Sequence, residues 1–65
     1  MNTYEILENG AVKHTCGQIG LAKLYARRIW SAWIDSGFSL GSVKIVKNGK
    51  VIVAKGYAVT TVGSL

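Results

Sequence analysis

EILENGAV at residues 5–12 and KIVKNGKV at residues 44–51 each place an Asn-Gly dipeptide between apolar-rich runs. Both central residues of a two-residue type I′ turn need a positive φ, which Gly adopts freely and Asn tolerates better than most side chains. The dipeptides Asn9-Gly10 and Asn48-Gly49 therefore predict two β-hairpins, over residues 3–15 and 43–55. The likeness of the two runs, offset by 39 residues (5 to 44), fits shared turn chemistry as well as a duplicated unit.

A two-residue loop also sets the pairing of the strands beside it. In the first hairpin it places Ile6 opposite Lys13 and Glu5 opposite His14, where the carboxylate and the imidazole could form a surface pair. The alternation leaves open which face of this hairpin is buried. In the second hairpin the alternation predicts a core face and an opposite face. The core face holds Val43, Ile45, Ile52 and Ala54, and the opposite face holds Lys44, Val46, Val51, Val53 and Lys55.

An amphipathic helix is predicted between the hairpins, over residues 16–36. Thr15 and Gln18 have the spacing of a capping box at its start, and Gly37 supplies the left-handed residue that ends many helices. At 100° per residue, the apolar residues of this segment fall on one broad arc and most of its charged residues on the other. Trp33 lies within the apolar arc and is expected in the core, whereas Trp30 lies at its border.

These elements predict a single α+β domain over residues 1–65, of order β-β-α-β-β, in which an antiparallel sheet of two hairpins packs on the helix. Phe38 to Ser42 form a short connector rich in Gly and Ser. Residues 57–62 are β-prone again and fit a fifth strand, a bent continuation of the hairpin or an arm that reaches a neighbouring subunit.

The composition predicts an intracellular protein that associates with itself. Of the 65 residues, 49% are apolar, and a chain of this length buries only about 60% of the surface that it exposes when unfolded. A single Cys excludes an intrachain disulfide framework, so we expect part of the apolar surface to be covered by another copy. The start of the chain lacks the features of a signal peptide and no apolar run is long enough to span a bilayer, which predicts a cytoplasmic location. We also expect no membrane partner: a basic amphipathic helix with Trp resembles a membrane-surface binder, but here strands are available to cover its apolar face.

Residues suited to catalysis are few. Cys16 at the expected helix start and His14 two residues before it are a nucleophile and a base by type, but no third orienting group is apparent. One His and one Cys fall short of the four ligands of a structural zinc site. We therefore expect no enzyme activity, no catalytic residues, no metal, no cofactor and no small-molecule substrate.

The most distinctive candidate site surrounds Trp30. Lys23, Arg27 and Ile34 are its neighbours on the helix, and this mixture of aromatic, apolar and basic groups is typical of docking patches. The alternative is that Trp30 only covers the edge of the core. Further candidates for the same surface are Leu24, Tyr57 and Val59. This favours a non-enzymatic binding or regulatory protein that forms homo-oligomers and docks on an unidentified protein. The small size of the chain fits a viral or plasmid accessory protein that modulates a host factor.

A nucleic-acid-binding module is the alternative function. The net charge of +5 supports it, since eight Lys and Arg face only three Asp and Glu. Binding would then use phosphate contacts from the second hairpin and the polar side of the helix. The candidate residues are Lys44, Lys47, Lys50, Arg27 and Arg28.

Overall fold

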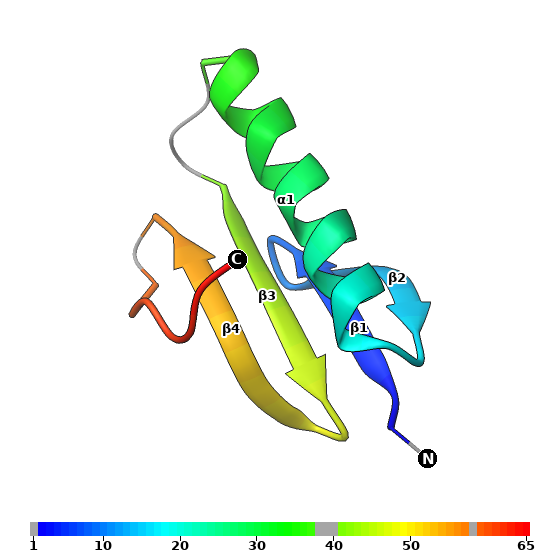
Figure 1. Ribbon diagram of the computed structural model, residues 1–65. Coiled ribbons are helices and arrows are strands. Elements are labelled where there is room, and N and C mark those ends of the chain that lie inside the picture. Colours follow the sequence, from blue (N-terminus) through cyan, green and yellow to red (C-terminus); the bar gives the residue numbers. More distant parts are fainter. Residues whose placement is uncertain (1, 38–40, 58) are drawn as a thin grey trace.

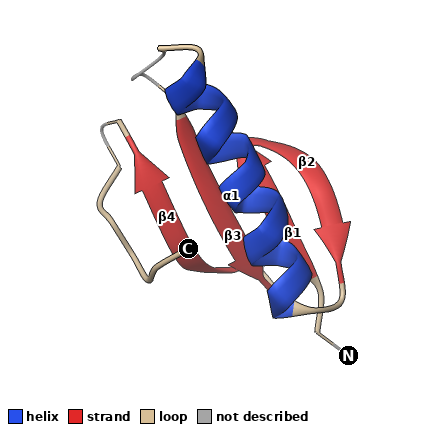
Figure 2. Cartoon of the chain, turned by 45° about the horizontal axis from the view of Figure 1, so that its top comes forward, coloured by secondary structure: helices blue, strands red, loops and turns tan. Residues whose placement is uncertain are grey.

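The computed structural model describes residues 2–37, 41–57 and 59–65. Its elements are β1 (Tyr4–Glu8), β2 (Ala11–Cys16), α1 (Ile19–Asp35), β3 (Ser42–Lys47) and β4 (Lys50–Gly56). The strands form one antiparallel sheet in the order β2-β1-β3-β4, and α1 lies across one face of it (Figure 1, Figure 2). The predicted α+β fold of two hairpins and a helix is confirmed. Residues 38–40 of the expected connector lie outside the described residues.

Both Asn-Gly turns have the predicted conformation. The φ angles are 54° at Asn9 and 86° at Gly10 in the first turn, and 49° at Asn48 and 84° at Gly49 in the second. All four residues thus have the positive φ that a type I′ turn requires. The twist of this turn matches that of the strands, which lets two-residue loops join β1 to β2 and β3 to β4.

Each turn Asn also binds the other hairpin. The side-chain Oδ1 of Asn9 accepts a hydrogen bond from the backbone N–H of Ser42 at 2.9 Å, and its own N–H donates to the Ser42 carbonyl at 3.0 Å. Asn48 makes the same two bonds with Thr3, both at 3.1 Å. The turn of one hairpin therefore holds the start of the other, at opposite ends of the β1–β3 pair.

The two hairpins are related by an approximate twofold axis. Ile6 pairs with Ile45 at the middle of the antiparallel β1–β3 ladder. Each hairpin carries a bulge on its second strand, with Lys13 as the extra residue in β2 and Ile52 in β4. Bulges, turns and Asn contacts all recur at an offset of 39 residues, so the likeness of the two sequence runs extends to their structure.

The bulge in β2 changes the expected pairing of the first hairpin. Because Lys13 is an extra residue, Ile6 lies opposite His14 and Glu5 lies opposite Thr15. The expected pairs of Ile6 with Lys13 and of Glu5 with His14 are wrong. His14 therefore shares the face of Ile6, toward the helix, and Glu5 faces away from it.

The bulge in β4 reverses the expected facing of the last part of the second hairpin. Val53 pairs with Ile45 and so faces α1, whereas Ala54 pairs with Lys44 on the opposite face. The prediction was right for β3 and for Ile52, which packs against the core. It was wrong for three residues beyond the bulge, because a single extra residue reverses the facing of everything after it. These residues are Val53, Ala54 and Lys55.

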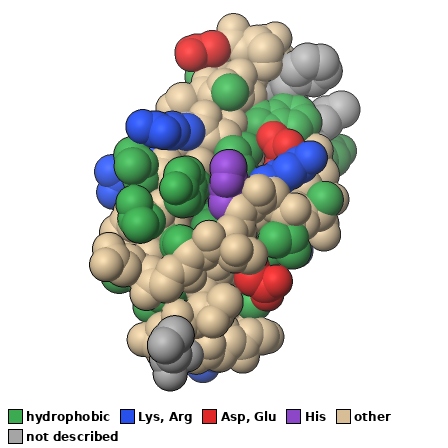
Figure 3. Space-filling view, turned by 90° about the vertical axis from the view of Figure 1, so that its right-hand side faces the viewer, with side chains coloured by type: hydrophobic (Ala, Val, Ile, Leu, Met, Phe, Trp, Pro, Cys, Tyr) green, Lys and Arg blue, Asp and Glu red, His purple; other side chains and the backbone are tan. Residues whose placement is uncertain are grey.

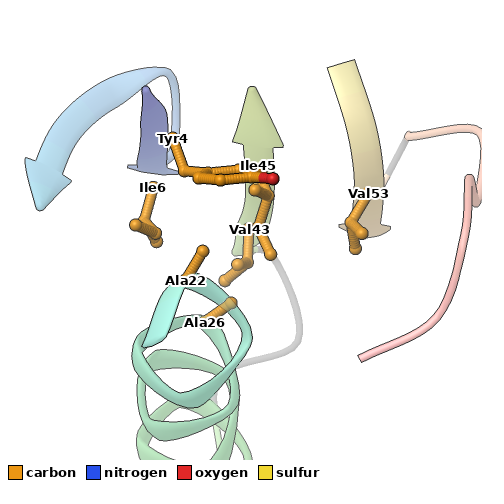
Figure 4. Close-up of a cluster of buried hydrophobic side chains, with 7 residues drawn as sticks. All are labelled: Tyr4, Ile6, Ala22, Ala26, Val43, Ile45 and Val53. Atoms are coloured by element: carbon orange, nitrogen blue, oxygen red, sulfur yellow. The ribbon is translucent and has the colours of Figure 1, made fainter. Parts of the chain in front are cut away.

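The core lies between α1 and the middle of the sheet. Figure 4 shows side chains from three strands converging on the helix, which contributes only the small side chains of Ala22 and Ala26. Such small residues let a helix approach a sheet closely. The first hairpin buries its Tyr4 and Ile6 face, which the sequence pattern left open. The cluster consists of Tyr4, Ile6, Ala22, Ala26, Val43, Ile45 and Val53.

The helix begins later than predicted and ends where predicted. Its first residue is Ile19, and the N-cap Gln18 makes no side-chain capping bond. Thr15 does not form a capping box because the ladder with β1 keeps it within β2. At the other end, Gly37 has φ 77° and its N–H donates to the carbonyl of Ile34 at 3.1 Å, which confirms the expected left-handed termination.

Trp33 is half-buried and not part of the fully buried core, which corrects the expectation. Its indole Nε1–H donates to Oε2 of Glu8 at 2.8 Å. Its ring lies against Gly41, where a Cβ would come within 2.4 Å of a ring carbon. Trp33 thus joins the C-terminal half of α1 to the edge of the core through its indole N–H and its close approach to the backbone at Gly41.

The C-terminal segment, residues 59–65, covers part of the sheet beside the helix. Ala54 and Val62 form an isolated antiparallel bridge, with N–H to O distances of 2.9 and 3.0 Å in the two directions. Beyond this bridge, Leu65 packs against the core, and Figure 4 shows the segment on the same side of β4 as the helix. Within the described residues it pairs with its own chain at one point and does not extend the sheet as a regular strand.

Candidate docking surface beside the helix

The two flanks of α1 contact different strands through aromatic side chains. On the β2 side, the rings of His14 and Tyr25 stack with centroids 4.5 Å apart and an interplanar angle of 13°. On the β4 side, the Nζ of Lys55 lies 5.2 Å from the ring centroid of Trp30, within the range of a cation–π contact. Trp30 therefore stands where the helix meets the outer strand.

A hollow of about 550 Å³ opens next to Trp30, between the C-terminal half of α1 and the end of β4. Two of its apolar side chains are largely in contact with solvent, since Ile34 is 59% exposed and Tyr57 is 62% exposed. We call this feature the Trp30 hollow. Its lining residues are Trp30, Ile34, Gly37, Lys55, Gly56, Tyr57 and Thr61.

Gly56 positions the outer wall of the Trp30 hollow. Its φ is +145°, and a Cβ there would lie 2.4 Å from the carbonyl oxygen of Gly41. A side chain at residue 56 is therefore excluded both by the backbone conformation and by the close approach of the Gly41 backbone. The next residue, Tyr57, donates its N–H to the same Gly41 carbonyl at 3.1 Å, which holds it at the rim.

The structure brings together part of the predicted docking surface. Trp30 and Ile34 line the Trp30 hollow, and the further candidate Tyr57 lines it too. Lys23 and Arg27 precede Trp30 by seven and three residues, so they lie on the same side of α1, toward its N-terminus.

Two of the further candidates lie elsewhere. Leu24 is 38% exposed and sits six residues before Trp30, on the solvent side of the helix. Val59 is half-buried and is not among the lining residues. Sequence reasoning missed Lys55 and Thr61 at this site. Lys55 was expected on the opposite face because nothing in the alternation of β4 reveals the bulge.

The candidate residues for nucleic-acid binding point in different directions. Lys44 is on the sheet face opposite the helix, whereas Lys47 lies over the Tyr4 ring on the helix side, 5.9 Å from its centroid. Lys50 is exposed at the second turn, and the adjacent Arg27 and Arg28 diverge by about 100° around α1. In Figure 3 the Lys and Arg side chains stand apart from one another, with Asp and Glu side chains on the same face. These five side chains therefore do not form one continuous basic surface.

The catalytic candidates have structural contacts. The Sγ of Cys16 is 3.4 Å from the carbonyl oxygen of Gln18, to which it donates, and His14 stacks on Tyr25. In the described part of the chain, no three side chains of His, Cys, Asp and Glu gather in a way that could hold a metal ion. Among the same residues, no helix has the length and apolar character needed to cross a bilayer.

Comparison of the chain with protein-family models, with curated proteins and with solved structures finds no match.

Proposed function

We propose that this protein is a non-enzymatic binding module that docks through the Trp30 hollow on an acidic segment of a partner protein. The observation that carries the proposal is the hollow itself, in which Ile34 and Tyr57 are exposed beside Trp30. Exposed aromatic and apolar side chains around a concavity are the usual anchors of protein recognition. This surface supports a binding or regulatory role, which requires no catalytic step.

The charge around the Trp30 hollow favours an acidic partner. Lys55 lines the hollow, and Lys23 and Arg27 continue the same side of α1. The three acidic residues lie elsewhere: Glu8 binds Trp33, Glu5 faces away from the helix, and Asp35 lies about 140° around the helix from Trp30. A partner segment with one apolar anchor for the hollow and carboxylates on either side would match this arrangement.

A peptide-display selection tests the proposal while the partner is unidentified. A random peptide library is selected on the immobilised protein, and the enriched peptides are then measured against the Tyr57→Ala and Lys55→Glu variants. We expect enrichment of peptides that combine Asp or Glu with Leu or an aromatic residue. Each variant is expected to weaken their binding at least tenfold, and added salt to weaken it further.

Leu24→Ala is the matched control, because Leu24 is an exposed apolar residue of the same helix that lies away from the hollow. It should leave binding of the selected peptides unchanged. Enriched peptides that bind the Tyr57→Ala variant as well as the unmodified protein would contradict the proposal, and so would a selection that enriches no common chemistry.

The alternative proposal, a nucleic-acid-binding module, is supported by the net charge of +5. Its residues are spread over both faces of the sheet and two directions of the helix, so we expect only weak phosphate-driven binding. Titration of a fluorescent DNA duplex at low and at moderate salt distinguishes the two functions. A complex that persists at moderate salt and is lost in the Lys47→Ala plus Lys50→Ala variant would favour this alternative over the Trp30 hollow.

A further inference from the structure

The sheet face opposite α1 is the second large surface of this protein, because the helix lies on the other side (Figure 4), and the C-terminal segment borders it at the β4 edge, where Val62 pairs with Ala54. We call it the open face. Cross-strand pairing identifies its members, because residues directly opposite one another share a face. Its apolar residues include Val12, which is 50% exposed, and Val51, which is 41% exposed. The central members of the open face are Glu5, Leu7, Val12, Lys44, Val46 and Val51.

We propose that a second copy of this chain covers the open face, so that the protein is a homodimer joined sheet to sheet. The surface is distinct from the Trp30 hollow, and the proposal does not depend on the function assigned to that hollow. Two observations support a second copy as the occupant: the charges of the open face and the approximate twofold axis that relates its residues.

The open face carries one acid and one base among apolar residues. Glu5 pairs with Val46 and Lys44 pairs with Leu7 on the two central strands. Since Glu5 and Lys44 correspond under the offset of 39 residues, the approximate twofold axis places them symmetrically about the middle of the face. Such a surface is complementary to itself when the second copy is related to the first by a twofold axis that runs across the strands.

Strand geometry shows how the charges meet. Consider a twofold axis that lies between the two facing sheets and runs perpendicular to the strands. Measured in the plane of the sheet, Lys44 of the second copy then lies one strand spacing, about 4.8 Å, from Glu5 of the first copy. The Glu5 residues of the two copies lie two residues apart along the strand direction, about 6.6 Å. Opposite charges are therefore closer than like charges, and the contact occurs twice because the interface is symmetric.

A nucleic acid fits less well, since the open face offers a single central lysine next to a carboxylate.

Charge-swap variants test the dimer. Lys44→Glu makes the central charges of the open face all acidic, and Glu5→Lys makes them all basic. We expect the unmodified protein to sediment as a dimer, and each variant alone to dissociate at least tenfold more readily. An equimolar mixture of the two variants should form dimers again, as should the double variant Glu5→Lys plus Lys44→Glu. Sedimentation velocity over a range of protein concentrations and native mass spectrometry measure these outcomes.

Lys50→Glu is the matched control, because it makes the same change of charge at an exposed residue next to the second turn. It should leave the dimer intact, and circular dichroism checks that every variant is folded. An unmodified protein that is monomeric at all concentrations overturns the proposal. So does a dimer that resists both single variants, or one that the hollow variant Tyr57→Ala disrupts instead.

Discussion

Asn9 and Asn48 each combine two roles. Each adopts a positive φ that allows a two-residue turn, and each uses its side-chain oxygen to hold the backbone of the other hairpin at Ser42 or Thr3. The first role is readable from the dipeptide Asn-Gly. The second role depends on β1 and β3 lying side by side, and no local sequence pattern predicts it.

Separate substitutions distinguish the two roles of Asn48. Asn48→Gly keeps the positive φ but removes the oxygen that binds Thr3, so we expect the free energy of unfolding to fall by about 0.5–1.5 kcal/mol. Asn48→Asp keeps an oxygen acceptor and should cost less. Urea denaturation measures both. The same pair of changes at Asn9 should give losses of similar size, whereas a loss at one turn only would contradict the equivalence of the hairpins.

At the scale of elements, the two bulges decide which side chains meet the helix. Both hairpins start in the register that a two-residue loop imposes, and both depart from it four residues after the Asn. The departure brings His14 toward Tyr25 and Lys55 toward Trp30. Without the bulge in β4, Lys55 would lie on the outer face of the sheet, because alternation alone places it there.

The C-terminal segment is an element whose role can be tested at Gly63. This residue has φ +63°, and a Cβ there would lie 2.6 Å from the carbonyl oxygen of Ile52. Gly63→Ala should therefore loosen the Ala54–Val62 bridge while the rest of the sheet stays folded. Hydrogen exchange checks this, with the amides of Ala54 and Val62 expected to exchange at least tenfold faster.

Gly20→Ala serves as the control for Gly63→Ala. A Cβ at Gly20 meets no atom within 4 Å, and Ala is the better helix former, so this change should be neutral or stabilising by up to about 1 kcal/mol. Unchanged exchange at Ala54 in the Gly63→Ala variant would show that the segment does not protect the outer strand.

The whole molecule presents two surfaces on opposite sides of one thin sheet. The helix side carries the Trp30 hollow, and the far side carries the open face. A chain of 65 residues covers only one face of its sheet with its helix, which leaves apolar residues such as Val12 and Val51 exposed on the other. Exposed apolar surface of this kind is typical of subunit contacts.

Self-association has a thermodynamic consequence for the whole molecule. If the native state is a dimer, its melting temperature should rise by about 3–6 °C for each tenfold increase in protein concentration. The Lys44→Glu variant should melt at a lower temperature than the unmodified protein at the same concentration. Differential scanning calorimetry measures both. A concentration-independent melting temperature for the unmodified protein would indicate a monomer.

The sequence by itself determined the elements of this protein, because turn residues and the helical period act over only a few neighbouring positions. Asn9-Gly10, Asn48-Gly49 and Gly37 each specify a local backbone conformation, and the structure has all three. Trp30 and Ile34 were likewise recognisable as neighbours from helical spacing alone.

Only the tertiary structure decided the strand order, the two bulges and the later start of the helix. These features depend on contacts between distant segments, as when β1 holds Thr15 in β2 and prevents a capping box. The Trp30 hollow needs Lys55 and Tyr57 to reach the helix from the far hairpin, and the open face exists because β1 and β3 are neighbours. A surface made by non-local pairing has no signature in the order of residues along the chain.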